Sequence, residues 1–221
     1  FYPERSLSLF GEQGGILTET QVWGGFTLFV SFLIVFRTSQ AYSRWWEGCA
    51  ACMVMRAEWY DSVSSLLAFC RHSSADPDEV QAFKQLLVRL GSMLHAAASA
   101  DIETAGCVEN IRHEYRMLSP DDLDPDSLEA LRLSQSKVEL LSQWIKQLCV
   151  EGLDAGILSI PAPLLARPFQ QLSTGFVGYH KALMIAVTQF PVAYTRICDG
   201  LICLFWLVVP VVTSQWATHW V

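Results

Sequence analysis

The sequence has little charge, and two of its stretches have none. Of 221 residues, 17% are Asp, Glu, Lys or Arg and 52% are apolar, whereas about 25% are charged in an ordinary soluble domain. So many apolar residues exclude a disordered chain and argue against an ordinary soluble enzyme. The net charge of −7 leaves no general basic surface, so no nucleic-acid partner is expected.

The sequence also lacks the motifs of common catalytic and metal sites. It has no Gly-rich phosphate loop, no G-x-S-x-G and no credible catalytic triad. Cys49 and Cys52 have the spacing of a redox or metal pair, but no second pair and no nearby histidine completes a site. The aspartates within 121–126 lack the glycine and the final glutamate of a calcium loop. We therefore expect no enzymatic activity, no metal ion and no cofactor.

The two uncharged stretches are the candidates for membrane segments, and only the second is clearly long enough to span. Thr20–Phe36 has 17 residues, which as a helix rise roughly 26 Å at ~1.5 Å per residue, slightly short of a ~30 Å hydrocarbon core. Gly200–Val221 has 22 residues and contains Pro210, which is expected to kink it. The alternative for either stretch is a buried core helix.

The positions of the cations give both stretches the same orientation. Cations follow the first stretch and precede the second, at Arg37, Arg44, Arg56, Arg167, Lys181 and Arg196. The positive-inside rule then places residues 38–196 on the cytoplasmic-like side. The predicted organisation is a membrane helix at 20–37, an aqueous helical region at 38–196 and a second membrane helix at 197–221. Arg196 and Asp199, three residues apart, are predicted to pair at the membrane boundary.

The aqueous region has the spacing of helices and no alternating strand pattern of useful length. One helix is predicted to start at Asp76-Pro77, where a cap, a first-turn proline and an acid follow in order. Its apolar side chains recur at three and four residues, at Val80, Phe83, Leu87, Leu90 and Leu94. A second helix starts near Ser119-Pro120 or Asp124-Pro125, and a third spans about Leu164–Val187. The predicted fold is all-α, with long helices that pass from the membrane into an aqueous bundle.

Two further segments carry a family resemblance. The uncharged helix ends in Phe36-Arg37-Thr38, and Tyr42 and Arg44-Trp45-Trp46-Glu47 follow. Much later, Gln189–Arg196 contains Pro191 and Tyr194 and leads into an apolar run that reaches Pro210. In this order and spacing, the two segments resemble the bestrophin family of ion channels, especially its bacterial and plant thylakoid members. The resemblance covers residues 20–215.

The resemblance implies a homopentamer around one central pore in a lipid bilayer. The family places its hydrophobic neck at Leu28, Phe32 and Phe36, which share one helix face. Five copies would stack three apolar rings that close by dewetting, and electropositive aromatic edges would stabilise a partly dehydrated anion. The implied function is passive permeation of chloride and other small anions such as bicarbonate and nitrate. On spacing alone, ordinary helix packing explains the same three residues.

The residues after the neck are interpreted as an interface motif. Trp45 and Trp46 are expected to anchor at the membrane interface, and Arg44 and Glu47 to pair between helices or subunits, with Tyr42 in the same motif. Arg37 either attracts anions or pairs with an acid or a lipid headgroup. The family's second constriction, the aperture, maps near Pro163 and Leu164, so Leu164 is the aperture candidate.

Several alternatives stay open. Residues 97–160 hold twelve acids and five bases, which would favour cations if they lined the pathway, and Cys49 stands where many relatives carry a cation. A cation-selective channel, a non-conducting structural membrane subunit and a soluble helical binding module are the rivals. Calcium dependence is left open because the family's calcium clasp uses a C-terminal segment that is not present, and we expect this chain to be part of a longer one. The membrane is either the plasma membrane or a plastid (thylakoid) membrane.

Overall fold

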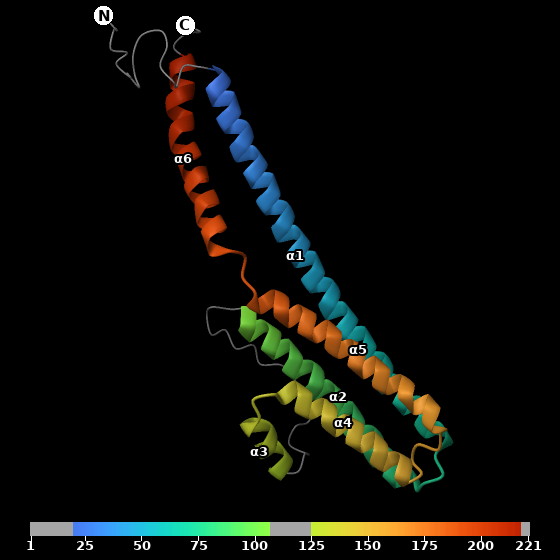
Figure 1. The fold of residues 1–221 in the computed structure, drawn as a ribbon. Helices are drawn as coiled ribbons and strands as arrows, with labels where there is room; N and C mark the ends of the chain where they lie inside the picture. The colour runs from blue at the N-terminus through green and yellow to red at the C-terminus, as the bar shows by residue number, and fades with distance from the viewer. Residues whose placement is uncertain (1–19, 107–124, 218–221) are drawn as a thin grey trace, which may run out of the picture. The chain divides into compact units, whose positions relative to one another are not determined.

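A computed structural model describes residues 20–106 and 125–217, and within these ranges every regular element is a helix (Figure 1). The elements are α1 (Thr20–Phe69), the short 3-10 helix η1 (Cys70–His72), α2 (Pro77–Gly106), α3 (Pro125–Leu133), α4 (Lys137–Asp154), α5 (Ala162–Val187) and α6 (Val192–Ala217). The all-α prediction is confirmed for this part of the chain. Two helices are long and apolar enough to cross a membrane, in the ranges Trp23–His72 and Val192–Ser214.

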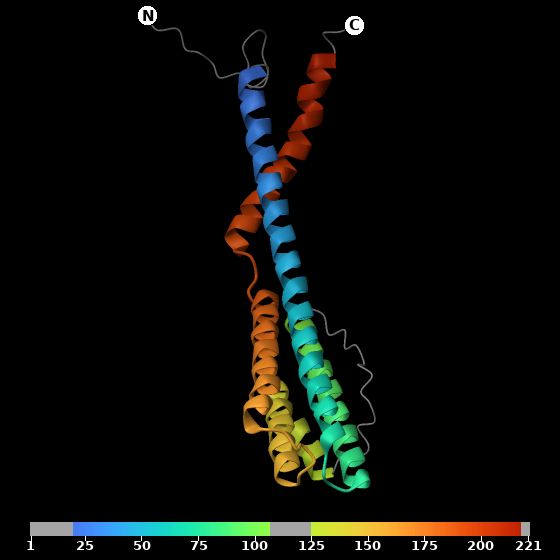
Figure 2. The same ribbon diagram turned by 90° about the vertical axis from the view of Figure 1, so that its right-hand side faces the viewer.

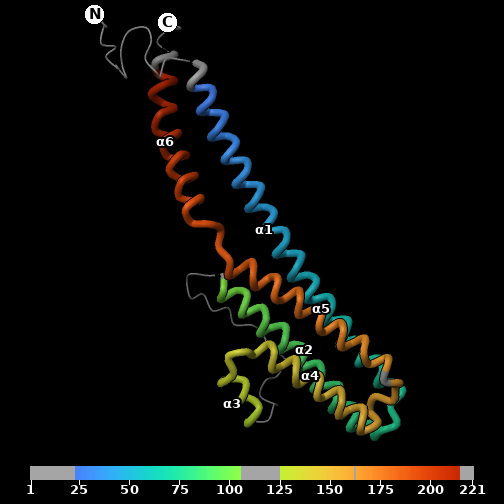
Figure 3. Tube along the Cα trace, viewed as in Figure 1, coloured from blue at the N-terminus to red at the C-terminus, as the bar shows by residue number. Residues whose placement is uncertain are grey.

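The chain divides into two compact units. The first unit comprises residues 1–45 and 189–221, and the second comprises residues 46–188. Helix α1 belongs to both, since it continues without a break for 50 residues (Figure 3). At ~1.5 Å per residue, such a helix is about 75 Å long, far longer than a bilayer core.

In the first unit, the first half of α1 packs against α6 through aromatic side chains. The rings of Trp23 and Phe205 stack at 5.8 Å and 3°, and Phe26 contacts Phe205 at 6.1 Å. Val30 on α1 and Val212 on α6 are fully buried between their neighbours. Most other side chains of the two apolar stretches are exposed, as expected for helices whose outer faces meet lipid or protein.

The second unit is a bundle in which α2 packs against α4 and α5. Its core includes the predicted stripe of α2, and those five side chains are all buried: Val80, Phe83, Leu87, Leu90 and Leu94. They meet Leu141 and Ile145 of α4 and Leu172 of α5 in one cluster. Figure 2 shows α2 and α5 beside the lower half of α1, on different sides of it.

Helix α5 approaches α1 closely because glycines face it. A Cβ added at Gly178 would lie 2.9 Å from the backbone N of Met55 and 3.0 Å from the backbone O of Ala51. Nearby, the Trp59 indole donates to the Leu172 carbonyl at 3.2 Å. These contacts fix the rotation of α1 in the second unit, and hence which of its faces stay outside the bundle.

The observed helix bounds follow the predicted start signals. Helix α2 begins at Pro77, and the Val80 amide donates to the Asp76 carbonyl at 3.1 Å. Helix α3 begins at Pro125, which agrees with the second of the two predicted starts, whereas Ser119-Pro120 lies outside the described residues. Helix α6 continues past Pro210.

Candidate functional site

The three neck candidates lie on an outward face of α1. Leu28, Phe32 and Phe36 are 73%, 63% and 41% exposed. The Phe32 and Phe36 rings lie 6.3 Å apart with their planes at 21°, so they form one aromatic strip along the helix. Because Val30 of the same helix is buried against the unit, Leu28 and Phe32 point away from the unit's own packing, whereas Phe36 is the least exposed of the three.

Phe36 is also held by the start of α6. Its ring meets the Tyr194 ring edge-on, at 6.1 Å and 75°, and Tyr194 in turn meets Phe190 at 5.5 Å. The two sequence segments that carry the family resemblance therefore touch each other through these rings. Sequence reasoning selected Tyr194 only as part of a motif and did not connect it to the neck.

Arg37 forms an ion pair at the end of the apolar stretch. Its guanidinium donates to the Asp199 carboxylate of α6. Of the alternatives for Arg37, the structure thus shows pairing with an acid. The predicted pairing of Asp199 with Arg196 is wrong, because Asp199 faces α1 in this unit and takes the cation of that helix.

A hollow follows directly after this ion pair. Its volume is about 360 Å³, and its lining residues come from α1 and from the start of α6: Arg37, Gln40, Ala41, Arg44, Phe190 and Thr195. Arg37 and Arg44 lie two helical turns apart, so they face the same side. The arrangement places Arg37 and Arg44 beside the end of the aromatic strip, and the Asp199 carboxylate offsets the charge of Arg37.

The remaining motif residues are largely exposed. The rings of Tyr42 and Trp45 lie 5.9 Å apart in the first unit, and Trp46 and Glu47 are exposed at the start of the second. Their role as anchors or interface partners stays a prediction.

Leu164 does not join the other site residues. It lies in the first turn of α5 in the second unit, with its side chain half exposed and its amide bonded to the Pro161 carbonyl at 2.9 Å. The assignment of the aperture to Leu164 stays a prediction.

The metal candidates can be placed in part. Within residues 20–106 and 125–217, no group of three or more His, Cys, Asp or Glu is positioned to hold a metal ion. Cys49 is exposed and Cys52 is half-buried on α1. The aspartates at 121, 122 and 124 lie outside the described residues, and Asp126 lies in the first turn of α3.

Sequence reasoning missed one buried polar pair in the second unit. The Tyr179 hydroxyl donates to the Asp101 carboxylate at 3.1 Å. The pKa of Tyr179 is raised, mainly because the phenol is buried and secondly because of the negative charge of Asp101. The pair ties α5 to α2 and contains no feature of a catalytic site.

Two helices that are long and apolar enough to cross a membrane, with most of their side chains exposed, are typical of a membrane protein of the helical class. A family model described as bacterial/fungal bestrophin protein matches residues 18–221. The chain therefore belongs to the bestrophin family, a family of channels and not of enzymes, and the predicted resemblance is confirmed. No curated protein and no solved structure matches the chain.

Proposed function

We propose that this chain is the pore-forming subunit of a homopentameric channel through which chloride and other small anions pass passively. The observation that carries the proposal is the outward strip of Leu28, Phe32 and Phe36 on an apolar helix that ends in arginine. Arranged around a shared axis, each position forms a ring. Residues 20–37 then line the pore, residues 38–196 form the aqueous region and residues 197–221 form the second membrane segment.

The neck would control ion passage through the stability of the water inside it. Apolar rings make a narrow constriction where water is unstable, so an ion passes only when the constriction is wide enough to hold water or when the wall replaces part of the hydration shell. Phe rings supply such a wall because their edges are electropositive. Phe36 forms the innermost of the three proposed rings, and its contact with Tyr194 restrains it. Because Tyr194 lies on α6, a shift of that helix would tilt the Phe36 side chain.

Charge at the inner end of the neck favours anions only modestly. Asp199 offsets the charge of Arg37, so this cation attracts an anion less than an isolated guanidinium would. A cation-selective channel and a non-conducting structural subunit are the competing functions, and each predicts a different electrical result.

The decisive experiment is the reversal potential of the purified full-length protein in a planar bilayer under a potassium chloride gradient. We expect reversal near the chloride equilibrium potential. Reversal near the potassium potential would replace anion selectivity with cation selectivity, and the lack of current from inserted assemblies would favour the structural subunit.

Two alanine variants test the position of the neck. Phe32→Ala removes one ring of the proposed constriction, so we expect a higher open probability or conductance. Ile34→Ala is the control, because Ile34 is also exposed but lies about 160° from Phe32 around the same helix. Equal effects of the two substitutions would contradict the assignment of Phe32 to the neck.

A further inference from the structure

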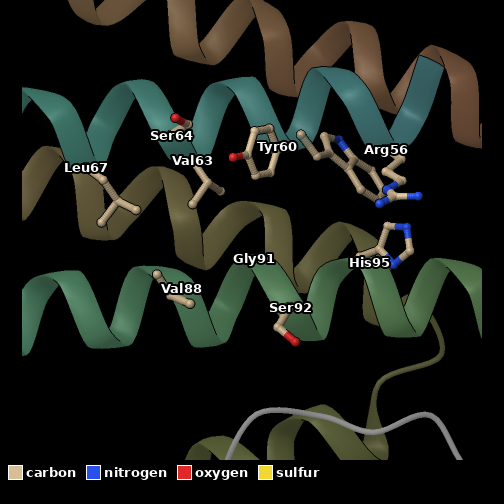
Figure 4. Close-up of a pocket in the computed structure, with 10 residues that line it drawn as sticks. Arg56, Tyr60, Val63, Ser64, Leu67, Val88, Gly91, Ser92 and His95 are labelled. Atoms are coloured by element: carbon tan, nitrogen blue, oxygen red, sulfur yellow. The ribbon is translucent and has the colours of Figure 1, made fainter. Parts of the chain in front are cut away.

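The second unit contains a groove between α1 and α2. Its volume is about 390 Å³, which is within the range of small-molecule sites. The groove follows α1 from Arg56 to Leu67, a length of about 16 Å at ~1.5 Å per residue. His95 of α2 lies at the Arg56 end and Val88 of α2 at the Leu67 end (Figure 4). The two ends of the groove therefore differ in chemistry.

One end of the groove is apolar. Val63 and Leu67 of α1 and Val88 of α2 line it (Figure 4). Val63 and Leu67 also pack against the core of the bundle, so their positions are fixed by the fold, and Val88 is 37% exposed. An apolar group of a ligand that entered here would leave water and contact a wall that is already in place.

The groove is narrow because α1 and α2 approach closely beside it. A Cβ added at Gly91 of α2 would lie 3.1 Å from Val63 Cγ2, tighter than an ordinary contact, so the glycine permits this approach. A narrow groove of this volume suits one unbranched apolar chain better than the two chains of a phospholipid.

The opposite end of the groove is cationic. Figure 4 shows the Arg56 side chain extending toward the His95 ring. The pKa of His95 is lowered, mainly by desolvation and secondly by the charge of Arg56, which agrees with a guanidinium close to that ring. None of the ten residues that line the groove, all in the described part of the chain, is an Asp or a Glu. An anionic group would therefore meet the guanidinium without competition from a carboxylate in the lining.

We propose that this groove binds a medium-chain fatty acid, with the carboxylate on Arg56 and the acyl chain along Val63, Leu67 and Val88. A guanidinium donates two parallel hydrogen bonds to a carboxylate, and the apolar end supplies the contact for the chain. The site goes beyond ion permeation and does not depend on it, because the groove lies in the second unit and not at residues 20–37. A protein that carried no current would still bind the fatty acid.

The first test maps where a fatty acid binds. A decanoic acid with a diazirine near its methyl end is photolysed with the full-length protein in mild detergent, and labelled residues are identified by peptide mass spectrometry. We expect labelling near Val63, Leu67 and Val88 that excess decanoate prevents. Labelling of the two apolar stretches reports partition only, and excess decanoate should not prevent it. Labelling confined to those stretches would overturn the proposal, as would a second copy of the chain covering the groove and excluding the probe.

The charge of the head group is tested with a competitor and with a variant. Decyltrimethylammonium has the same chain as decanoate but a cationic head, so we expect it to compete at least tenfold less well for the groove. Arg56→Gln should weaken decanoate competition about tenfold, as expected for the loss of a hydrogen bond to a charged group. Arg71→Gln is the control, because Arg71 is exposed in η1 outside the groove. Equal competition by the two amphiphiles, or equal behaviour of the two variants, would overturn the assignment of the carboxylate to Arg56.

Two tryptophan variants test the apolar end. Val88→Trp places an indole in the groove, so we expect it to abolish the labelling that decanoate prevents, with helical circular dichroism retained. Val150→Trp is the control, because Val150 is also exposed, at 48%, but lies on α4 and should leave that labelling unchanged. If Val88→Trp is labelled like the wild type, the acyl chain does not lie in the groove and the proposal fails.

Discussion

At the scale of single residues, the proposed channel gives the Arg37–Asp199 pair a specific role: the pair sets how much charge an ion would meet after the neck. The pair is partly exposed, so solvent screening keeps its contribution to stability small. In the proposed channel, the pair matters more for permeation than for stability, because the Asp199 carboxylate cancels the charge of Arg37 beside the aromatic strip.

Removing the Asp199 carboxylate should increase the preference of the proposed channel for anions. We expect Asp199→Asn to shift the reversal potential toward the chloride equilibrium value, because the charge of Arg37 is then unpaired. The double variant Arg37→Gln/Asp199→Asn is the control, since it removes both charges and should restore the wild-type value. No shift, or a shift toward the potassium equilibrium value, would contradict this role of the pair.

Tyr179 should make the stability of the second unit depend on pH under alkaline conditions. Its pKa is raised in the folded state, so the neutral phenol is favoured by folding. The stability it contributes is complete below the unfolded pKa of about 10 and is lost as pH rises through the higher folded value. We expect thermal unfolding in detergent to show a fall in Tm above about pH 10 that is smaller in Tyr179→Phe. An identical alkaline fall in the variant would contradict this role.

At the scale of elements, the contact between α1 and α5 depends on the absence of a side chain at one position. Gly178→Ala would place a Cβ against backbone atoms of Met55 and Ala51, which cannot move without shifting a helix. We expect a loss of about 1–3 kcal/mol, typical of overpacking, measured as a lower Tm by circular dichroism.

Gly48→Ala is the matched control for that substitution. Gly48 is also in a helix of the second unit, but its added Cβ would meet only Ile185 Cγ2 at 3.9 Å, an ordinary contact. Alanine there should raise stability by about 0.5–1 kcal/mol through helix propensity. Destabilisation of equal size at both glycines would show that the contact distance is not the cause.

At the scale of the whole molecule, local patterns predicted the helices, while pairings between distant residues were not predictable. The stripe of α2 and its start at Pro77 follow from spacing and capping, which act within a few residues. Arg37 and Asp199 are separated by 162 positions, and nothing in either neighbourhood specifies the other. The Phe36–Tyr194 contact was missed for the same reason.

The membrane assignment itself can be tested with one residue type at two positions. Leu207 on α6 and Leu133 on α3 are both highly exposed, at 71% and 77%, but only Leu207 lies in a range that can cross a bilayer. An arginine near a bilayer centre costs about 2.5–3.5 kcal/mol on insertion scales. We therefore expect Leu207→Arg to reduce the fraction of the protein that stays in the membrane pellet after alkaline carbonate extraction, and Leu133→Arg to leave that fraction unchanged.

If the wild-type chain is itself extracted into aqueous buffer without detergent, its apolar helices are paired with protein instead of lipid. That result would favour the soluble helical module and remove the basis of the channel.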